Sequence, residues 1–423
     1  MKIFRVSNVE RFASKIIPKQ PQKNKKIVES ILKKVQKDGD LAIRKYEKKF
    51  SGAKLSSFRV SKIEIKNAYK KILKQEILAI NLSKKRLEKT ESIVKSVLKN
   101  KTINTDGIKI FKKFVPIQST GCYIPGGLAK YPSSVIMSVI PAKVAGVKKI
   151  IVVSPPNSDG KIDPLTIVAA DICGANEIYK VGGAQGIAAL SFGTESIPKV
   201  DKIVGPGGAF VTIAKYLISH RTAIDMLAGP TELGIIADSS ANPEFVALDL
   251  ISQSEHSKDT FCFLITNSEK LAKSVNQNIQ DLIKKVKRSD LVQQSLKQNG
   301  FIAICNKKSD MIKLANELAP EHLQIMTKNP QSIASKITST GLILIGNDTP
   351  SSASDYILGS NHILPTNGFG KTRGSLSVLD FIKIETQVTA SRTSLSKISK
   401  YLDVFTKAEG LPNHFEAVRG RLK

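Results

Sequence analysis

Residues 149–186 read KIIVVSPPNSDGKIDPLTIVAADICGANEIYKVGGAQG and carry the clearest fold pattern of the chain. Residues 149–153 form a short, mostly apolar run that soon meets two prolines, as is typical of a buried strand. Residues 167–173 predict a helix that stops at Gly174, and residues 177–181 predict the next strand. A strand, a helix and a second strand in this order predict a parallel sheet with helices on both faces.

The same alternation continues along the chain. Residues 200–204 predict another strand of this first unit. A second series of apolar runs follows, with helical patterns between them, and its predicted strands are residues 233–238, 261–266, 301–305 and 342–345. We therefore predict an α/β fold built from two Rossmann-like parallel-sheet units in tandem.

The two ends of the chain have a different character. From about residue 22 to residue 100, apolar residues recur at helical spacing between many lysines, which predicts a helical N-terminal region. From about residue 384 the chain is polar and helical, too short for a core of its own, and expected to pack as an arm on another lobe or subunit. The predicted domains are 1–105 (mainly helical), 106–232 (first Rossmann-like unit), 233–383 (second Rossmann-like unit) and 384–423 (C-terminal arm).

Composition narrows the class of protein. A chain of 423 residues with 41% hydrophobic residues is typical of a globular protein with more than one lobe. No stretch approaches the roughly 20 apolar residues of a membrane span, and the N-terminus lacks a signal-peptide core, so we expect a cytoplasmic protein. The four cysteines are widely spaced and form no C-x-x-C pair, which argues against thiolate zinc sites and disulfides.

The net charge of +29 raises the question of nucleic-acid binding. Only eleven of the 65 basic residues are arginine, the residue that makes most bidentate contacts to bases and phosphates. Aromatic residues are few and do not interleave with the basic runs, as they do in many single-strand binders. We therefore interpret the lysines as a solvated surface and expect no nucleic-acid partner.

A carboxylate stands directly before an imidazole in Ala319-Pro320-Glu321-His322-Leu323. Residues 310–318 are predicted to be helical and Pro320 ends the helix, so the pair is expected in a rigid turn at the helix exit. A carboxylate near its pKa and a neutral imidazole suit general base chemistry at neutral pH. Glu-His is also a common surface dipeptide, and this stretch alone does not choose between the two interpretations.

Three of the five histidines stand near other potential metal ligands. Gln253 and His256 are three residues apart at a predicted helix end, which places both side chains on one face if the helix continues. Asp355 and His362 share a loop rich in turn-forming residues, and His414 lies near the C-terminus. Imidazoles, a carboxylate and an amide oxygen together suit zinc or a similar metal. Scattered histidines also occur as ordinary hydrogen-bonded residues, so the pattern leaves both possibilities open.

Two glycine-rich loops, residues 182–186 and 205–208, each follow a predicted strand. Neither matches the spacing G-x-G-x-x-G of dinucleotide-binding loops. Ligands of open parallel sheets bind at the carboxyl ends of strands, where small residues allow a cofactor to approach the backbone. The same glycines also suit tight turns between strand and helix.

Taken together, ordered motifs over most of the chain resemble the histidinol dehydrogenase family. The matching segments are Tyr123-Ile124-Pro125-Gly126-Gly127, Tyr131-Pro132-Ser133-Ser134-Val135, Val181-Gly182-Gly183-Ala184-Gln185, Phe192-Gly193-Thr194-Glu195-Ser196, Ile224-Asp225-Met226-Leu227-Ala228-Gly229-Pro230, Gln253-Ser254-Glu255-His256, Ala319-Pro320-Glu321-His322-Leu323, Asp355-Tyr356, Asn361-His362-Ile363-Leu364-Pro365-Thr366, Glu409-Gly410-Leu411 and His414.

The resemblance implies a zinc- and NAD-dependent enzyme. It implies one zinc ion per subunit, with ligands Gln253, His256, Asp355 and His414, and the catalytic pair Glu321 and His322. It also implies NAD contacts at Tyr123, Gln185 and Gly208 in the first unit. The implied substrate contacts are Thr231, Gln253, His256, His322, Asp355, Glu409 and His414. In this family the C-terminal ligand reaches across a homodimer, which suits an arm without a core.

The reaction that the resemblance implies is a four-electron oxidation of L-histidinol through L-histidinaldehyde to L-histidine, with two NAD+ reduced in turn. His322 is expected to take the alcohol proton, and Glu321 to help activate water on the aldehyde. Zinc is expected to anchor and orient the substrate. The alternatives are a related zinc and NAD dehydrogenase of another small alcohol, such as sulfopropanediol, and a zinc hydrolase with Glu321 as base.

This chain departs from the family pattern at three positions. Gly208 stands where the family usually has Asn, so one cofactor hydrogen bond is expected to be lost or replaced by water. Thr231 stands where Ser is common and keeps the hydroxyl, and Gly186 replaces a usual Ala. Because no metal ligand and neither member of the catalytic pair is altered, we expect an active enzyme.

Overall fold

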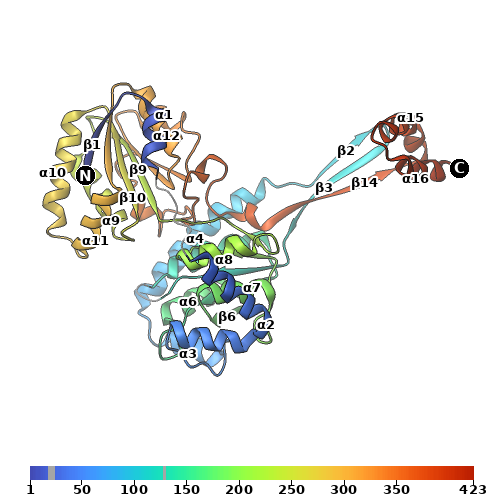
Figure 1. Ribbon diagram of the computed structural model, residues 1–423, viewed down its shortest axis with the longest axis horizontal. Helices are drawn as coiled ribbons and strands as arrows, with labels where there is room; N and C mark the ends of the chain where they lie inside the picture. Colours follow the sequence, from blue (N-terminus) through green and yellow to red (C-terminus); the bar gives the residue numbers. More distant parts are fainter. Residues whose placement is uncertain (18–23, 127–129) are drawn as a thin grey trace.

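The computed structural model describes residues 1–17, 24–126 and 130–423. Figure 1 shows two α/β lobes and a long arm that leaves them and carries the C-terminus. Each lobe is built on one parallel sheet, which confirms the predicted pair of Rossmann-like units. The arm is built on a third, antiparallel sheet.

The first sheet has the strand order β6-β5-β4-β7-β8, and all its strands are parallel. Its strands are β4 (Ser119–Tyr123), β5 (Lys149–Ser154), β6 (Glu177–Lys180), β7 (Lys202–Val204) and β8 (Ala223–Ile224). Its helices are α5 (Pro132–Ala145), α6 (Pro164–Cys173), α7 (Gly183–Phe192) and α8 (Ala209–Ile218). This is the lobe predicted from residues 149–186.

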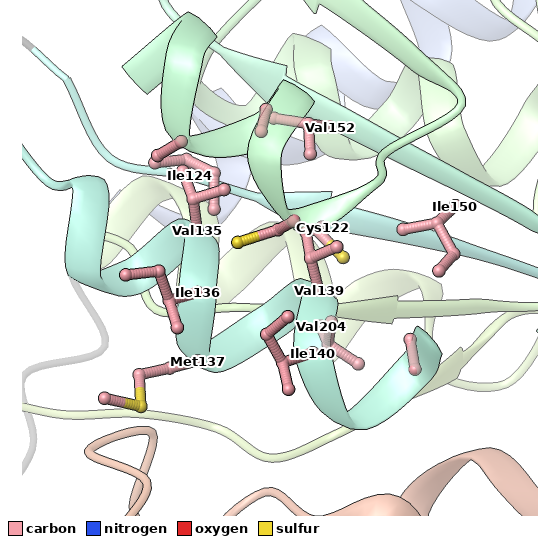
Figure 2. Close-up of a cluster of buried hydrophobic side chains, with 14 of the residues drawn as sticks. Cys122, Ile124, Val135, Ile136, Met137, Val139, Ile140, Ile150, Val152 and Val204 are labelled. Carbon is pink, nitrogen blue, oxygen red and sulfur yellow. The ribbon is translucent and has the colours of Figure 1, made fainter. Parts of the chain in front are cut away.

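Both faces of the first sheet are covered by helices. On one face, side chains of α5 such as Val135 and Val139 lie beside Cys122 and Val152 of the sheet, as Figure 2 shows. Helices α7 and α8 cover the other face. The N-terminal helices α2 (Lys25–Phe50), α3 (Lys62–Tyr69) and α4 (Lys74–Ser96) add an outer layer, with α2 on α7 and α8, α3 on α6, and α4 on α5.

The second sheet has the strand order β1-β11-β10-β9-β12-β13 and is also parallel. Its strands are β1 (Lys2–Val6), β9 (Glu232–Ala237), β10 (Phe261–Thr266), β11 (Phe301–Cys305), β12 (His322–Met326) and β13 (Leu342–Ile345). Helices α9 (Pro243–Ser254), α10 (Glu269–Ile283) and α11 (Ser289–Asn299) cover one face. Helices α1 (Val9–Ile16), α12 (Lys308–Leu318) and α13 (Pro330–Ala334) cover the other, and α14 (Ser351–Ser354) follows β13.

Two strands of this sheet were not expected from the sequence. Residues 2–6 form β1 at the edge of the second sheet, although the sequence predicted a mainly helical N-terminal region. The stretch containing Glu321 and His322 was predicted as a turn, but His322 begins the buried strand β12, in the centre of the sheet between β9 and β13. Helix α12 ends at Leu318, and Ala319 adopts a left-handed conformation with φ of 45° before Pro320.

The arm begins as a ribbon of strands. β14 (Ile382–Ala390) pairs with β3 (Ile108–Pro116), which pairs with β2 (Lys101–Thr105), so residues 384–390 are extended rather than helical as predicted. Helices α15 (Arg392–Ala408) and α16 (Pro412–Leu422) pack on each other at the tip (Figure 1). The short turns η1 (Phe369–Lys371) and η2 (Val378–Phe381) precede β14. None of the helices in the described residues is both long and apolar enough to cross a membrane.

Candidate active site

A cavity of about 300 Å³ lies where the two lobes meet. The first sheet contributes the carboxyl end of β7, where Pro206, Gly207 and Gly208 follow the strand. The second sheet contributes its amino edge, because Thr231 directly precedes β9 and His322 is the first residue of β12. The cavity is therefore formed by the carboxyl end of the first sheet and the amino end of the second sheet.

Glu321 and His322 line this cavity and are both buried. Glu321 Oε2 accepts hydrogen bonds from Thr231 Oγ1 at 2.6 Å and from the Glu232 backbone nitrogen at 2.9 Å. His322 Nδ1 lies 3.3 Å from the Glu232 carbonyl oxygen, and Nε2 lies 3.1 Å from Asp355 Oδ1. Every one of these contacts joins segments that are distant in the sequence, which is why the dipeptide alone was ambiguous.

The electrostatic setting of the pair favours proton transfer. Burial raises the pKa of Glu321, although the charge of His322 and the hydrogen bond from Thr231 oppose the shift. Burial alone would lower the pKa of His322, but the charge of Glu321 and the hydrogen bond to Asp355 outweigh it and raise the pKa to about 9. A carboxylate and an imidazole with displaced pKa values in one cavity are typical of acid–base sites.

Thr231 connects the pair to a third side chain. Its hydroxyl donates to Glu321 and accepts a 2.8 Å hydrogen bond from Gln253 Nε2. The amide nitrogen of Gln253 is thereby engaged in a hydrogen bond, and its amide oxygen stays available to coordinate a metal ion. Gln253 lies in the last turn of α9, and His256, just beyond that helix, lines the same cavity as the sequence predicted.

The predicted metal ligands are only partly assembled within one chain. Gln253, His256 and Asp355 all line the cavity. Burial lowers the pKa of His256, and the hydrogen bond and charge of His322 keep the pKa of Asp355 low against the effect of burial. Among the described residues no group of three or more His, Cys, Asp or Glu side chains is placed to hold a metal ion. The donor types of Gln253, His256 and Asp355, an amide, an imidazole and a carboxylate, nevertheless fit three of the four ligands of a zinc site.

The fourth predicted ligand lies far from the cavity. His414 belongs to α16 and Glu409 caps α15, and both side chains are exposed at the tip of the arm (Figure 1). Neither residue lines the cavity of its own chain. The structure thus brings together Thr231, Gln253, His256, His322 and Asp355 from the predicted substrate set, and leaves Glu409 and His414 apart.

The predicted NAD contacts lie on the first lobe, but only one lines the cavity. Gly208 does so, and a Cβ at this position would meet no other atom within 4 Å, so the absence of a side chain there is not forced by space. Tyr123 and Gln185 are buried: the tyrosine oxygen accepts from the Gly183 backbone nitrogen at 3.0 Å, and Gln185 Nε2 donates to Glu47 at 2.9 Å. Their contact with NAD stays a prediction, and Gly127 of the neighbouring motif lies outside the described residues.

The structure places two further side chains at the site, His362 and Glu232, to which the sequence assigned no role. His362 lines the cavity, with Nδ1 2.7 Å from the Asp355 carbonyl oxygen and Nε2 3.3 Å from Ser134 Oγ. In the sequence it stood seven residues after Asp355 and within a motif that resembles the family, but no site role was assigned to it. Glu232 contacts both members of the catalytic pair through its backbone. Nothing in the sequence distinguished it from an ordinary strand residue.

Known proteins resemble the chain over its whole length. The histidinol dehydrogenase family model matches residues 17–422. Histidinol dehydrogenase of Methanocaldococcus jannaschii is 43% identical over 94% of this chain and 92% of that protein. Histidinol dehydrogenase of Oceanobacillus iheyensis is 41% identical over 94% of each.

A solved structure of the same family is also similar to this chain. The crystal structure of histidinol dehydrogenase from Elizabethkingia anophelis has a TM-score of 0.94 and 35% identity, covering 100% of this chain and 98% of that one. The fold and the placement of the motifs around one cavity agree with these matches. The chain belongs to the histidinol dehydrogenase family.

Proposed function

We propose that this chain oxidises L-histidinol through L-histidinaldehyde to L-histidine, and that one NAD+ is reduced in each of the two steps. The observation that carries the proposal is the buried pair Glu321 and His322, which shares one cavity with Gln253, His256 and Asp355. Family membership supports histidinol as the substrate and NAD as the oxidant.

In the first step the alcohol loses a proton and a hydride. The Glu232 carbonyl oxygen, 3.3 Å from Nδ1, orients the His322 ring, and Nε2, which faces Asp355 Oδ1 in this structure, would take the hydroxyl proton once Asp355 binds the metal instead. When bound, NAD+ would supply the acceptor for the hydride, and the aldehyde would stay in the cavity, where it is protected from side reactions.

In the second step water adds to the aldehyde, and a second NAD+, when bound, would accept the hydride of the hydrate. One carboxylate oxygen of Glu321 is held by Thr231 and the Glu232 backbone, so the other is free to accept a proton from the attacking water. Burial raises the pKa of Glu321 and so makes it a stronger base than an exposed glutamate. The product carries the oxygen of that water as part of its carboxylate.

We also propose a zinc site made of Gln253, His256 and Asp355, completed by His414 of a second copy of the chain. When bound, zinc supplies a Lewis-acidic anchor that fixes the amino group and imidazole of the substrate. Thr231 presents the amide oxygen of Gln253 by binding its amide nitrogen. Glu409 is assigned to the substrate, and Tyr123, Gln185 and Gly208 to NAD.

A homodimer with shared sites accounts for the arm. Helices α15 and α16 bury only Ser394 and Thr406 between them, while Tyr401, Val404 and Phe405 stay exposed. These three residues are three and four positions apart on α15 and so share one face, and apolar side chains exposed together are typical of an interaction surface, whereas single ones are not. An arm that docks on a second copy buries these residues and brings its His414 and Glu409 to the neighbour's cavity.

The stoichiometry of NADH tests the proposed reaction. Zinc-loaded protein with excess NAD+ is expected to form about two NADH per histidinol consumed, because both oxidation steps occur at one site. A ratio near one shows that the aldehyde is the final product, and no NADH contradicts the proposal. The same assay with sulfopropanediol separates histidinol oxidation from the alternative substrate.

A further inference from the structure

Glu232 is a buried carboxyl that no step of the proposed reaction uses. It is the first residue of β9, it is 6% exposed, and it does not line the cavity. β9 and β12 are neighbouring parallel strands in which Leu233 pairs with His322. Glu232 and Glu321 therefore stand side by side, one residue before that pair.

The two glutamates are joined by a reciprocal pair of hydrogen bonds. The backbone nitrogen of Glu232 donates to Glu321 Oε2 at 2.9 Å, and the backbone nitrogen of Glu321 donates to Glu232 Oε2 at 3.1 Å. Each carboxyl group thus holds the start of the other's strand. Since Glu321 carries its side chain on the peptide that Glu232 binds, a change in Glu232 moves the catalytic carboxylate directly.

The second oxygen of Glu232 holds another wall of the cavity. Oε1 accepts from the Asn367 backbone nitrogen at 2.9 Å. The adjacent Thr366 lines the cavity, and its hydroxyl accepts from the Gly229 backbone nitrogen at 2.6 Å. One carboxyl group therefore links β12 and the loop of residues 366–367, and this loop in turn holds the segment that leads into β9.

We propose that Glu232 is a positioning residue that acts through Glu321, holding its carboxylate in place for attack of water on the aldehyde. This inference rests on the proposed role of Glu321 in the second oxidation step. Glutamine cannot replace Glu232 fully, because it offers one acceptor oxygen where two backbone N–H groups need one each.

A double-mutant cycle between E232Q and E321Q tests the inference. The rate of histidinaldehyde oxidation in E232Q is expected to fall by roughly 10²-fold, the usual cost of a small misplacement of a catalytic group. The first oxidation is expected to fall less, and KM for histidinol to change little. In the E321Q background, E232Q is expected to add less than about twofold, since it acts through a group already removed. Independent, multiplicative losses overturn the inference.

The controls separate this inference from loss of folding and from failure of the proposed function. E91Q is the matched control, because Glu91 is another buried carboxyl that accepts from a backbone nitrogen, that of Val378, outside the cavity. Equal slowing of both oxidation steps in E232Q overturns the inference, since a general structural defect affects both. If E232Q does not fold, Glu232→Asp replaces it in the same cycle. E321Q with the wild-type rate contradicts the proposed role of Glu321 itself and, with it, the inference.

Discussion

The side chains around the cavity are buried and hydrogen-bonded, whereas many of those at the tip of the arm are exposed. Around the cavity, Glu321, His322 and Thr231 are held by hydrogen bonds from several segments of the same chain. On the arm, Val404 and Phe405 are 66% and 67% exposed, and α16 buries none of its residues. The difference indicates that the hydrogen bonds around Glu321 and His322 are complete within one chain, whereas the metal and substrate contacts that we propose for the arm would need a second chain.

Removing the imidazole of the cavity gives the largest expected effect. H322N is expected to lower kcat by about 10³-fold, because the group that takes the alcohol proton is lost. Zinc content is expected to stay near one per chain, since His322 is not assigned as a ligand. Steady-state NADH formation and metal analysis on the same sample measure both. Loss of zinc in H322N means that this histidine belongs to the metal site instead.

A charge on the arm tests whether its exposed apolar residues form a dimer interface. F405D is expected to weaken a dimer by roughly 10²-fold, as for a buried aromatic at the centre of an interface. Sedimentation velocity measures the shift to monomer, and activity should fall in parallel. I63D is the matched control, because Ile63 is also an exposed apolar residue, 72% exposed, but on α3 of the first lobe. Unchanged assembly in F405D removes the argument for a docked arm.

A smaller effect concerns stability within the lobes. Burial and the charge of Asp380 raise the pKa of Glu91 to about 7, from an ordinary value of 4.5. The folded chain therefore binds this proton more tightly than the unfolded chain, and the stabilisation is lost as pH rises through 7. The contribution to the free energy of unfolding should fall by about 1 kcal/mol between about pH 6 and pH 8. Denaturant titrations of wild type and E91Q measure it, and an equal pH dependence in both disproves the assignment.

The lobes were predictable because their patterns are local. Residues 149–186 carry apolar runs, a helical segment and stop signals that specify β5, α6 and β6 without help from distant residues. β12 was missed because the proline before it suggested a turn, and because His322 and Gln324 interrupt its apolar run although both are buried. Their burial depends on partners elsewhere: Asp355 for the histidine and Asp249 for the glutamine.

The site was predictable through motifs rather than through local chemistry. Gln253, His256 and Asp355 were predicted with the catalytic pair, and the structure places all five beside one cavity. Glu232 could not be found in this way, because its role comes from the register between β9 and β12. The strand β1 was also missed, since five residues at a chain end carry too weak a pattern to show which sheet they join.

In the proposed dimer, each active site combines the cavity of one chain with the arm of another. Mixing H322N with H414A, each inactive alone, tests it by subunit exchange. A heterodimer then contains one site with both wild-type residues, since His322 comes from one chain and His414 from its partner. Random pairing is expected to restore about a quarter of the wild-type activity in a two-fold dimer. If exchange is complete and no activity returns, both residues act within one chain and the claim is wrong.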